Sequence, residues 1–177
     1  NCLAGRDVAD GDNDPRPPST DYSHGTHVSG IIGAVSNNGI GISSVGLNKV
    51  KIIPVKSTNT PSYITHAYEG VVWAANNGAK IINASWGGGG FSSALQSAIQ
   101  RFQNSGGIFV AAAGNESSNN AAVASYPANY PLTNVISVAA STQSDTLASF
   151  SNYGTNVDIV APGSSILSTI PGNRYAR

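Results

Sequence analysis

The chain has little cysteine and no long apolar run, which excludes several classes of protein. Among its 177 residues there is one cysteine, Cys2, and no methionine. A single cysteine excludes an internal disulfide. No apolar run approaches the roughly 20 residues that a membrane-spanning helix needs, so the sequence predicts no such helix. No signal peptide opens the chain, as we expect if residue 1 already lies inside a domain.

An excess of charge of one sign is also missing. Nine Lys and Arg balance nine Asp and Glu, so the formal net charge is +0. Without a net positive field there is nothing to attract nucleic acid or an anionic membrane surface, and we expect neither as a partner. Charged residues make up 10% of the chain, well below the roughly 25% of an average globular protein. Small residues with Ser and Asn take their place, which is typical of compact secreted enzymes but not diagnostic of them.

Two kinds of apolar run alternate along the chain. Short, almost wholly apolar runs predict strands, and runs with helical spacing predict helices. Strands are expected at residues 51–56, 80–85, 108–113, 134–140 and 157–160, and helices from Pro61 until Asn77 and from about 92 to 104. This alternation predicts a single α/β domain over residues 1–177, with a mostly parallel, doubly wound sheet and helices on both faces, in three layers.

A histidine stands at the start of a further predicted helix. The polar run at residues 19–23 gives way at His24 to apolar residues with helical spacing, namely Val28, Ile31, Ile32 and Val35. A histidine held at a rigid helix end is suited to act as a general base near neutral pH. A surface or helix-capping histidine is the alternative.

Two further segments complete a chemical pattern. Residues 85–88, Ser-Trp-Gly-Gly, and residues 111–116, Ala-Ala-Ala-Gly-Asn-Glu, each follow a predicted strand. Both therefore lie at the carboxyl end of a strand, where open parallel sheets bind their ligands. Together with the histidine, they favour acyl-transfer chemistry on a peptide.

With these three motifs in this order, the chain resembles the subtilisin-like serine proteases. The resemblance covers nearly the whole chain: the histidine motif and residues 50–56, 79–88, 107–116, 126–127 and 148–169. It implies the subtilisin-like α/β fold, an extracellular location, extended peptide or protein substrates, and hydrolysis by a Ser-His-Asp triad. His24 would be the catalytic histidine. His27 could suggest a metal pair with it, but the His-Glu-x-x-His signature is absent and carboxylate and cysteine ligands are not nearby. The resemblance implies that His27 is structural.

The other two members of the triad do not occur in a matching context. The chain has no Asp-Ser/Thr-Gly turn and no Gly-Thr-Ser-Met-Ala motif; residues 154–156 read Gly-Thr-Asn. We therefore expect the middle of a protease domain, incomplete at both ends and inactive alone, whose sheet is covered by the missing segments or by another chain. The alternative is a non-catalytic homologue that keeps the fold and a peptide-binding cleft. The Gly-x-Ser-x-Gly elbow of an α/β-hydrolase is also absent.

The resemblance also implies binding residues. Asn115 would donate its side-chain amide to the oxyanion, with a turn asparagine of positive φ as the alternative. Glu116 would stand at the rim of the specificity pocket and favour a basic substrate residue, unless it is a solvated loop glutamate. The other expected residues of the cleft and pocket are Ser85, Trp86, Gly87, Gly88, Ala113, Gly114 and Ser125.

Calcium is the cofactor that the resemblance implies. Its site would use the side-chain oxygen of Asn37 and the carbonyl oxygens of Val35, Ile40 and Ile42, with further ligands from residues ahead of residue 1. A second acidic segment, with Asp10, Asp12 and Asp14, has a spacing that some thermostable relatives use for calcium. A solvated acidic turn is the alternative there.

Overall fold

The computed structural model describes all 177 residues, which form two compact units. One unit comprises Asn1–Gly70 together with Ile166–Arg177, and the other comprises Val71–Ser165. Helix α2, Ala67–Asn76, spans the point in the sequence where the first unit gives way to the second. No helix is long and apolar enough to cross a membrane.

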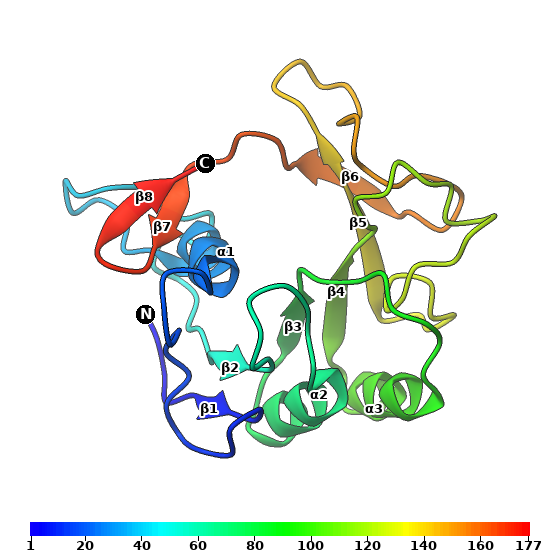
Figure 1. Ribbon diagram of the computed structural model, residues 1–177, viewed down its shortest axis with the longest axis horizontal. Helices are drawn as coiled ribbons and strands as arrows, with labels where there is room; N and C mark the ends of the chain where they lie inside the picture. The colour runs from blue at the N-terminus through cyan, green and yellow to red at the C-terminus, as the bar shows by residue number, and fades with distance from the viewer. The chain divides into compact units, whose positions relative to one another are not determined.

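A parallel sheet of four strands forms the centre of the second unit (Figure 1). Its strands lie in the order β3, β4, β5 and β6, with bounds Ile81–Ala84, Ile108–Ala112, Val135–Ser141 and Ile159–Pro162. Every neighbouring pair is parallel. This confirms the predicted α/β fold with a parallel sheet and helices, although the last strand begins two residues later than the sequence indicated.

Helix α3, Ser93–Asn104, follows the predicted bounds closely because its sequence carries both a cap and an apolar stripe. The Ser92 side chain accepts a hydrogen bond from the backbone N–H of Leu95 at 3.3 Å, which satisfies one of the free donors of the first turn. The apolar residues at helical spacing, Leu95, Ala98, Ile99 and Phe102, are all buried. They pack the helix against β4.

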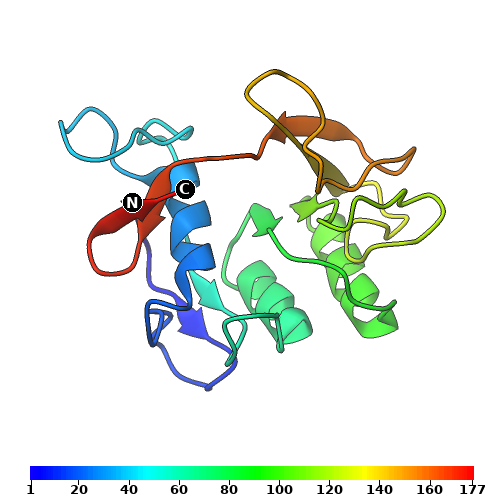
Figure 2. The same cartoon turned by 45° about the horizontal axis from the view of Figure 1, so that its top comes forward.

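The first unit is built around helix α1, Ser23–Gly33, and a C-terminal hairpin (Figure 2). Strands β7, Ser168–Ile170, and β8, Arg174–Ala176, pair antiparallel, and β7 packs against α1. Gly30 allows this close approach, because a Cβ there would collide with the side chains of Ser168 and Thr169. Thr169 Oγ1 also donates a hydrogen bond of 3.0 Å to the Thr26 carbonyl oxygen. A second pair, β1 at Arg6–Asp7 and β2 at Val55–Lys56, is parallel.

Two predicted elements of the first unit differ from the structure. The strand expected at 51–56 is reduced to β2, which is preceded by an isolated bridge between Ile52 and Cys2. Pro54 lies between Ile52 and β2 and has no N–H to donate to a continuous ladder. The helix expected from Pro61 begins only at Ala67. Residues 58–65 instead form turns, in which the Thr58 hydroxyl bonds to nearby backbone carbonyl oxygens.

Candidate active site

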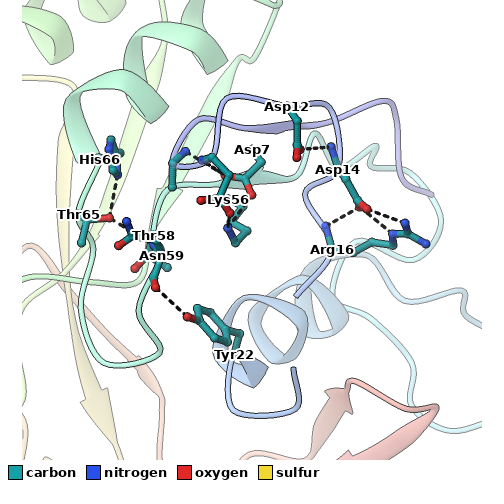
Figure 3. A network of polar contacts seen from close by, with 12 residues as sticks. Asp7, Asp12, Asp14, Arg16, Tyr22, Lys56, Thr58, Asn59, Thr65 and His66 are labelled. Atoms are coloured by element: carbon teal, nitrogen blue, oxygen red, sulfur yellow. Dashed lines mark hydrogen bonds and ion pairs between the residues drawn. The ribbon is translucent and has the colours of Figure 1, made fainter. Parts of the chain in front are cut away.

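The predicted general base lies at the start of α1, as the sequence indicated. His24 is the second residue of the helix, and it is exposed. Tyr22, directly before the helix, makes no capping bond with its side chain. Its hydroxyl instead donates a 2.8 Å hydrogen bond to the carbonyl oxygen of Asn59 (Figure 3). This bond ties the start of α1 to the turns that follow β2.

His27 has a structural environment. Its Nε2 atom lies 3.1 Å from the carbonyl oxygens of both Ile166 and Ala176. A ring with its proton on Nε2 can donate to these acceptors, which connects α1 to the hairpin of β7 and β8. No group of three or more His, Cys, Asp or Glu residues in the structure is arranged to hold a metal ion. These contacts support the interpretation of His27 as a structural residue.

In the second unit, the two polar segments leave adjacent parallel strands at the same edge of the sheet, since Ala84 of β3 is paired with Ala111 of β4. Gly87 lies close to both β4 and the 125–126 segment. A Cβ on Gly87 would stand 3.7 Å from the Ala112 carbonyl oxygen and from Ser125 Oγ. The structure therefore brings the expected residues of the cleft wall and of the pocket floor together.

The turn at residues 113–116 presents the predicted oxyanion donor. Gly114 has a φ of +121°, and a Cβ there would collide with the side chains of Asn152 and Glu116. Asn115 does not have a positive φ, so the alternative of a left-handed turn asparagine is wrong: Gly114 takes that conformation. The Asn115 residue is exposed, while Ala113 before it is buried.

Glu116 is exposed but not merely solvated. Its Oε2 atom accepts the backbone N–H of Asn115 at 3.0 Å and the Asn152 side-chain amide at 2.8 Å. A Cβ on Gly88 would lie 3.9 Å from its other carboxylate oxygen, Oε1. The carboxylate therefore fastens the turn and faces the glycine segment of the cleft wall.

Two buried asparagines that the sequence analysis missed hold this turn from beneath. Asn120 and Asn152 are 1% and 2% exposed. The Nδ2 atoms of both donate to the carbonyl oxygen of Ala113, at 2.8 Å and 3.1 Å. Neither residue stands in a recognisable motif, and asparagines are common in the loops of this chain, so no local signal could have identified them.

Ser125, the expected floor of the pocket, is followed in the chain by a tyrosine of an aromatic cluster. Ser125 is 5% exposed, and its hydroxyl has no hydrogen-bond partner. The glycine segment bridges to the next residue, Tyr126, at Gly89. Beyond it, the ring of Phe91 packs edge-on against Tyr126 and Tyr130, with centroid distances of 5.5 Å and 5.8 Å. Of the other expected cleft residues, Ser85 and Trp86 are half-buried.

Comparison with known proteins places this geometry in a family. The model of the subtilase family, a family of peptidases, matches residues 5–177. The chain belongs to the subtilase family. It is 43% identical over 176 residues to a thermophilic serine proteinase of Bacillus sp. strain AK1, covering 98% of this chain and 42% of that protein. It is 41% identical over 176 residues to thermitase of Thermoactinomyces vulgaris, covering 98% of this chain and 60% of thermitase.

Solved structures agree with this assignment. A protease of Pseudoalteromonas arctica superposes with a TM-score of 0.84 at 30% identity, over 99% of this chain and 66% of its own. A cold-adapted subtilisin-like serine proteinase superposes with a TM-score of 0.83 at 36% identity, over 98% of this chain and 60% of its own. The chain thus spans between 42% and 60% of the length of the two sequence relatives named above.

The loop after α1 does not by itself form the calcium site implied by the subtilase resemblance. Val35, Asn37 and Ile40 are exposed, and Ile42 is half-buried. The loop is fastened by the Asn48 side chain, which accepts the Ser36 N–H at 2.9 Å and donates to the Ser36 carbonyl at 3.0 Å. The four predicted ligands supply one side-chain oxygen and three carbonyls, fewer than the six to eight oxygens that calcium takes.

Two cations of the chain form ion pairs with Asp7, Asp10 and Asp14 of the acidic segment near the N-terminus (Figure 3). Lys56 Nζ lies 2.6 Å from Asp7 Oδ2 and 2.7 Å from Asp10 Oδ2. Burial raises the pKa of Asp7, but the hydrogen bonds from Lys56 and from backbone amides outweigh it, so the pKa lies below its ordinary value. The hydrogen bond from Arg16 lowers the pKa of Asp14 to about 2. The segment forms an ion-paired turn, in which Asp12 accepts the Asp14 N–H at 2.8 Å.

Proposed function

We propose that the protein containing this chain is a serine endopeptidase of the subtilisin type that hydrolyses extended peptides. The observation that carries the proposal is the edge of the sheet in the second unit. There, the turn bearing Asn115 and the glycine segment Gly87–Gly88 leave adjacent strands together. Membership of a peptidase family makes acyl transfer the chemistry that such an edge would serve.

In this proposal each group has a defined task. His24 accepts the proton of a serine nucleophile as it attacks the scissile carbonyl, and returns that proton to the leaving amine. The Asn115 amide donates to the oxygen of the tetrahedral intermediate, where negative charge develops. The segment Ser85–Gly88, which follows β3, pairs with the extended backbone of the substrate, and Trp86, Ala113, Gly114 and Ser125 line the cleft and the pocket. Glu116 stands at the rim of the pocket.

Kinetics of Asn115→Ala in the catalytically competent protein test the proposal. We expect kcat to fall roughly 100-fold or more with little change in KM, because the lost donor acts only in the transition state. Asn104→Ala, which removes an exposed asparagine at the end of α3, is the matched control and should leave both constants unchanged. A loss that appears mainly in KM would show that Asn115 binds substrate rather than the oxyanion.

The second candidate is a non-catalytic homologue that retains a peptide-binding cleft. These 177 residues contain neither the serine motif nor the aspartate motif of the family, so the two candidates differ in what the rest of the protein supplies. We infer that residues 1–177 alone do not hydrolyse peptides. Incubation of the purified chain with an active-site serine probe and a peptide substrate tests this. Stoichiometric labelling, or turnover that is lost in His24→Ala, would place the nucleophile within these residues.

We further propose that other segments of the same domain, or another chain, cover the sheet of the second unit. β3 and β6 are its edge strands. Ile81 on β3 is 61% exposed, and Ile159 and Val160 on β6 are 52% and 55% exposed. These exposed apolar side chains lie on the two opposite edge strands, and covering them would remove apolar surface from water. Size-exclusion chromatography of residues 1–177 should therefore show self-association, and a strictly monomeric, cooperatively folded chain would argue against the proposal.

An extracellular location and structural calcium complete the proposed function, and both rest on membership of the subtilase family. Calcium would be held at Val35, Asn37, Ile40 and Ile42 only with additional oxygen ligands from other segments. Thermal unfolding of the catalytically competent protein with calcium and with a chelator tests the site. A melting temperature that does not respond to calcium would exclude it.

A further inference from the structure

The side chain of Asn152 makes five hydrogen bonds beneath the turn that carries Asn115. Its Oδ1 atom accepts the backbone N–H groups of Glu116 and Ser118, at 2.9 Å and 3.0 Å. Its Nδ2 atom donates to Glu116 Oε2 at 2.8 Å, and also reaches the Ala113 carbonyl and Asn120 Oδ1, at 3.1 Å and 3.0 Å. These two N–H donors determine which end of the Asn152 amide faces the turn, because a flipped amide would place its NH2 group against them.

These bonds enclose Asn115 from both sides in the sequence. Asn152 holds Ala113 before it, and Glu116 and Ser118 after it, while the backbone N–H of Asn152 donates to the Gly114 carbonyl at 3.0 Å. Glu116 Oε2, which receives the Asn152 amide, is also the acceptor of the Asn115 N–H at 3.0 Å. One carboxylate oxygen therefore links the buried asparagine to the exposed one.

Position matters more for an oxyanion donor than for an ordinary surface amide. A hydrogen bond to a developing charge is strong only when the donor is held close to its required place, and displacement of about 1 Å can cost roughly 100-fold in rate. Because Asn115 is exposed, packing of its side chain does not hold its backbone in place. The carboxylate of Glu116 holds the Asn115 N–H, and the buried Asn152 holds that carboxylate.

We propose that Asn152 is a positioning residue for Asn115, acting through Glu116. The inference rests on the proposed function, because it gives Asn152 the task of positioning Asn115, the oxyanion donor of that site. Asn152 itself does not contact substrate, because it is 2% exposed. Its contribution is to keep the Glu116 carboxylate in place as an acceptor for the Asn115 N–H.

Asn152→Asp in the catalytically competent protein is the decisive variant. It keeps the oxygen that accepts the two backbone N–H groups, but it places a second carboxylate oxygen against Glu116 Oε2. We expect kcat to fall at least about tenfold with KM changed less than about threefold, because Asn152 makes no contact with substrate and the donor that it positions acts in the transition state. Asn156→Asp is the matched control: it makes the same change on an exposed residue of the same loop and should leave kcat unchanged.

The effect of Asn152→Asp in a Glu116→Ala background tests whether it passes through the carboxylate. Without the carboxylate, Asn152 no longer has an acceptor of the Asn115 N–H to hold in place, so adding Asn152→Asp to Glu116→Ala should lower kcat by less than about threefold further. Hydrogen exchange of the Asn115 amide in residues 1–177 gives a readout without activity. Exchange should accelerate in Asn152→Asp and in Glu116→Ala, and it should not accelerate further in the double variant.

The outcomes separate this inference from the proposed function. If Asn115→Ala lowers kcat but Asn152→Asp does not, or if Asn152→Asp lowers kcat as much in the Glu116→Ala background as in the wild type, the positioning role is wrong while the function stands. If Asn115→Ala leaves kcat unchanged, the oxyanion role itself is wrong. Should Asn152→Asp unfold the protein, Asn152→Ser takes its place, and unchanged kcat together with unchanged exchange at Asn115 would overturn the inference.

Discussion

Asp7→Asn removes the carboxylate at the centre of the ion-paired turn, which pairs with Lys56 and so connects β1 to β2. Asp7 and Lys56 face each other in the register of the two strands, and their side chains are 4% and 8% exposed. The substitution keeps the oxygen that accepts the Ala9 and Asp10 N–H groups, at 2.9 Å and 3.0 Å. It replaces the oxygen that accepts Lys56 with an NH2 group, which turns a donor toward the ammonium.

The expected cost follows from what Lys56 retains. Breaking a fully buried ion pair costs about 3–5 kcal/mol, because the remaining charge is left without compensation. Lys56 keeps Asp10, whose side chain is 55% exposed and solvates part of the charge. We therefore expect the free energy of unfolding to fall by about 2–3 kcal/mol at neutral pH. Urea unfolding followed by circular dichroism measures this difference.

The control and the pH dependence make the expectation refutable. Asp14→Asn breaks the ion pair with Arg16, which is exposed to solvent, so it should leave the unfolding free energy unchanged within error.

The cost of Asp7→Asn should be greatest between pH values near 3.8 and 10.5, the ordinary pKa values of the two groups. Burial lowers the pKa of Lys56, but its two carboxylate partners raise it by more, so the pKa lies above its ordinary value. The contribution of Lys56 to stability is therefore lost as pH rises through that raised pKa. The Asp7 contribution is lost as pH falls through the lowered pKa of Asp7. A cost that does not vary with pH, or a cost equal to that of Asp14→Asn, would refute the ion-pair argument.

Three further predictions concern the cleft. Gly114→Ala should destabilise the protein by roughly 2 kcal/mol or more and lower kcat, because its φ of +121° and the Asn152 side chain leave no place for a Cβ; unfolding and kinetics measured together check this. Ser125→Ala should leave stability unchanged or raise it by up to about 1 kcal/mol, since the buried hydroxyl has no partner to lose, and a clear loss in urea unfolding would mean that the hydroxyl is satisfied. Glu116→Gln should reduce the preference for Lys over Phe before the scissile bond, through a screened interaction of under about 1 kcal/mol, and an unchanged ratio of kcat/KM for matched substrates would dismiss the rim role.

The accuracy of the sequence predictions varied with the range of the interactions that form each element. α3 was predictable because its cap, Ser92, and its apolar stripe lie within a dozen residues of each other. The predicted start of α2 at Pro61 was wrong, and the helix begins at Ala67, because proline in a first turn is a weak local signal. The hydrogen bonds of Thr58 to Thr60 and Tyr63 hold the same residues in turns.

The sequence by itself determined the alternation of strands and helices, the order of three motifs that mark a subtilase, and the place of His24 at a helix start. These follow from local patterns of apolar residues, caps and turn residues. Only the tertiary structure decided that Asn152, 36 residues after Glu116, holds the turn at residues 113–116. It alone decided that Lys56 neutralises Asp7, 49 residues earlier, and that the β7–β8 hairpin packs on α1. Contacts of this kind depend on how distant segments fold together, and the pattern of residues within either segment does not predict them.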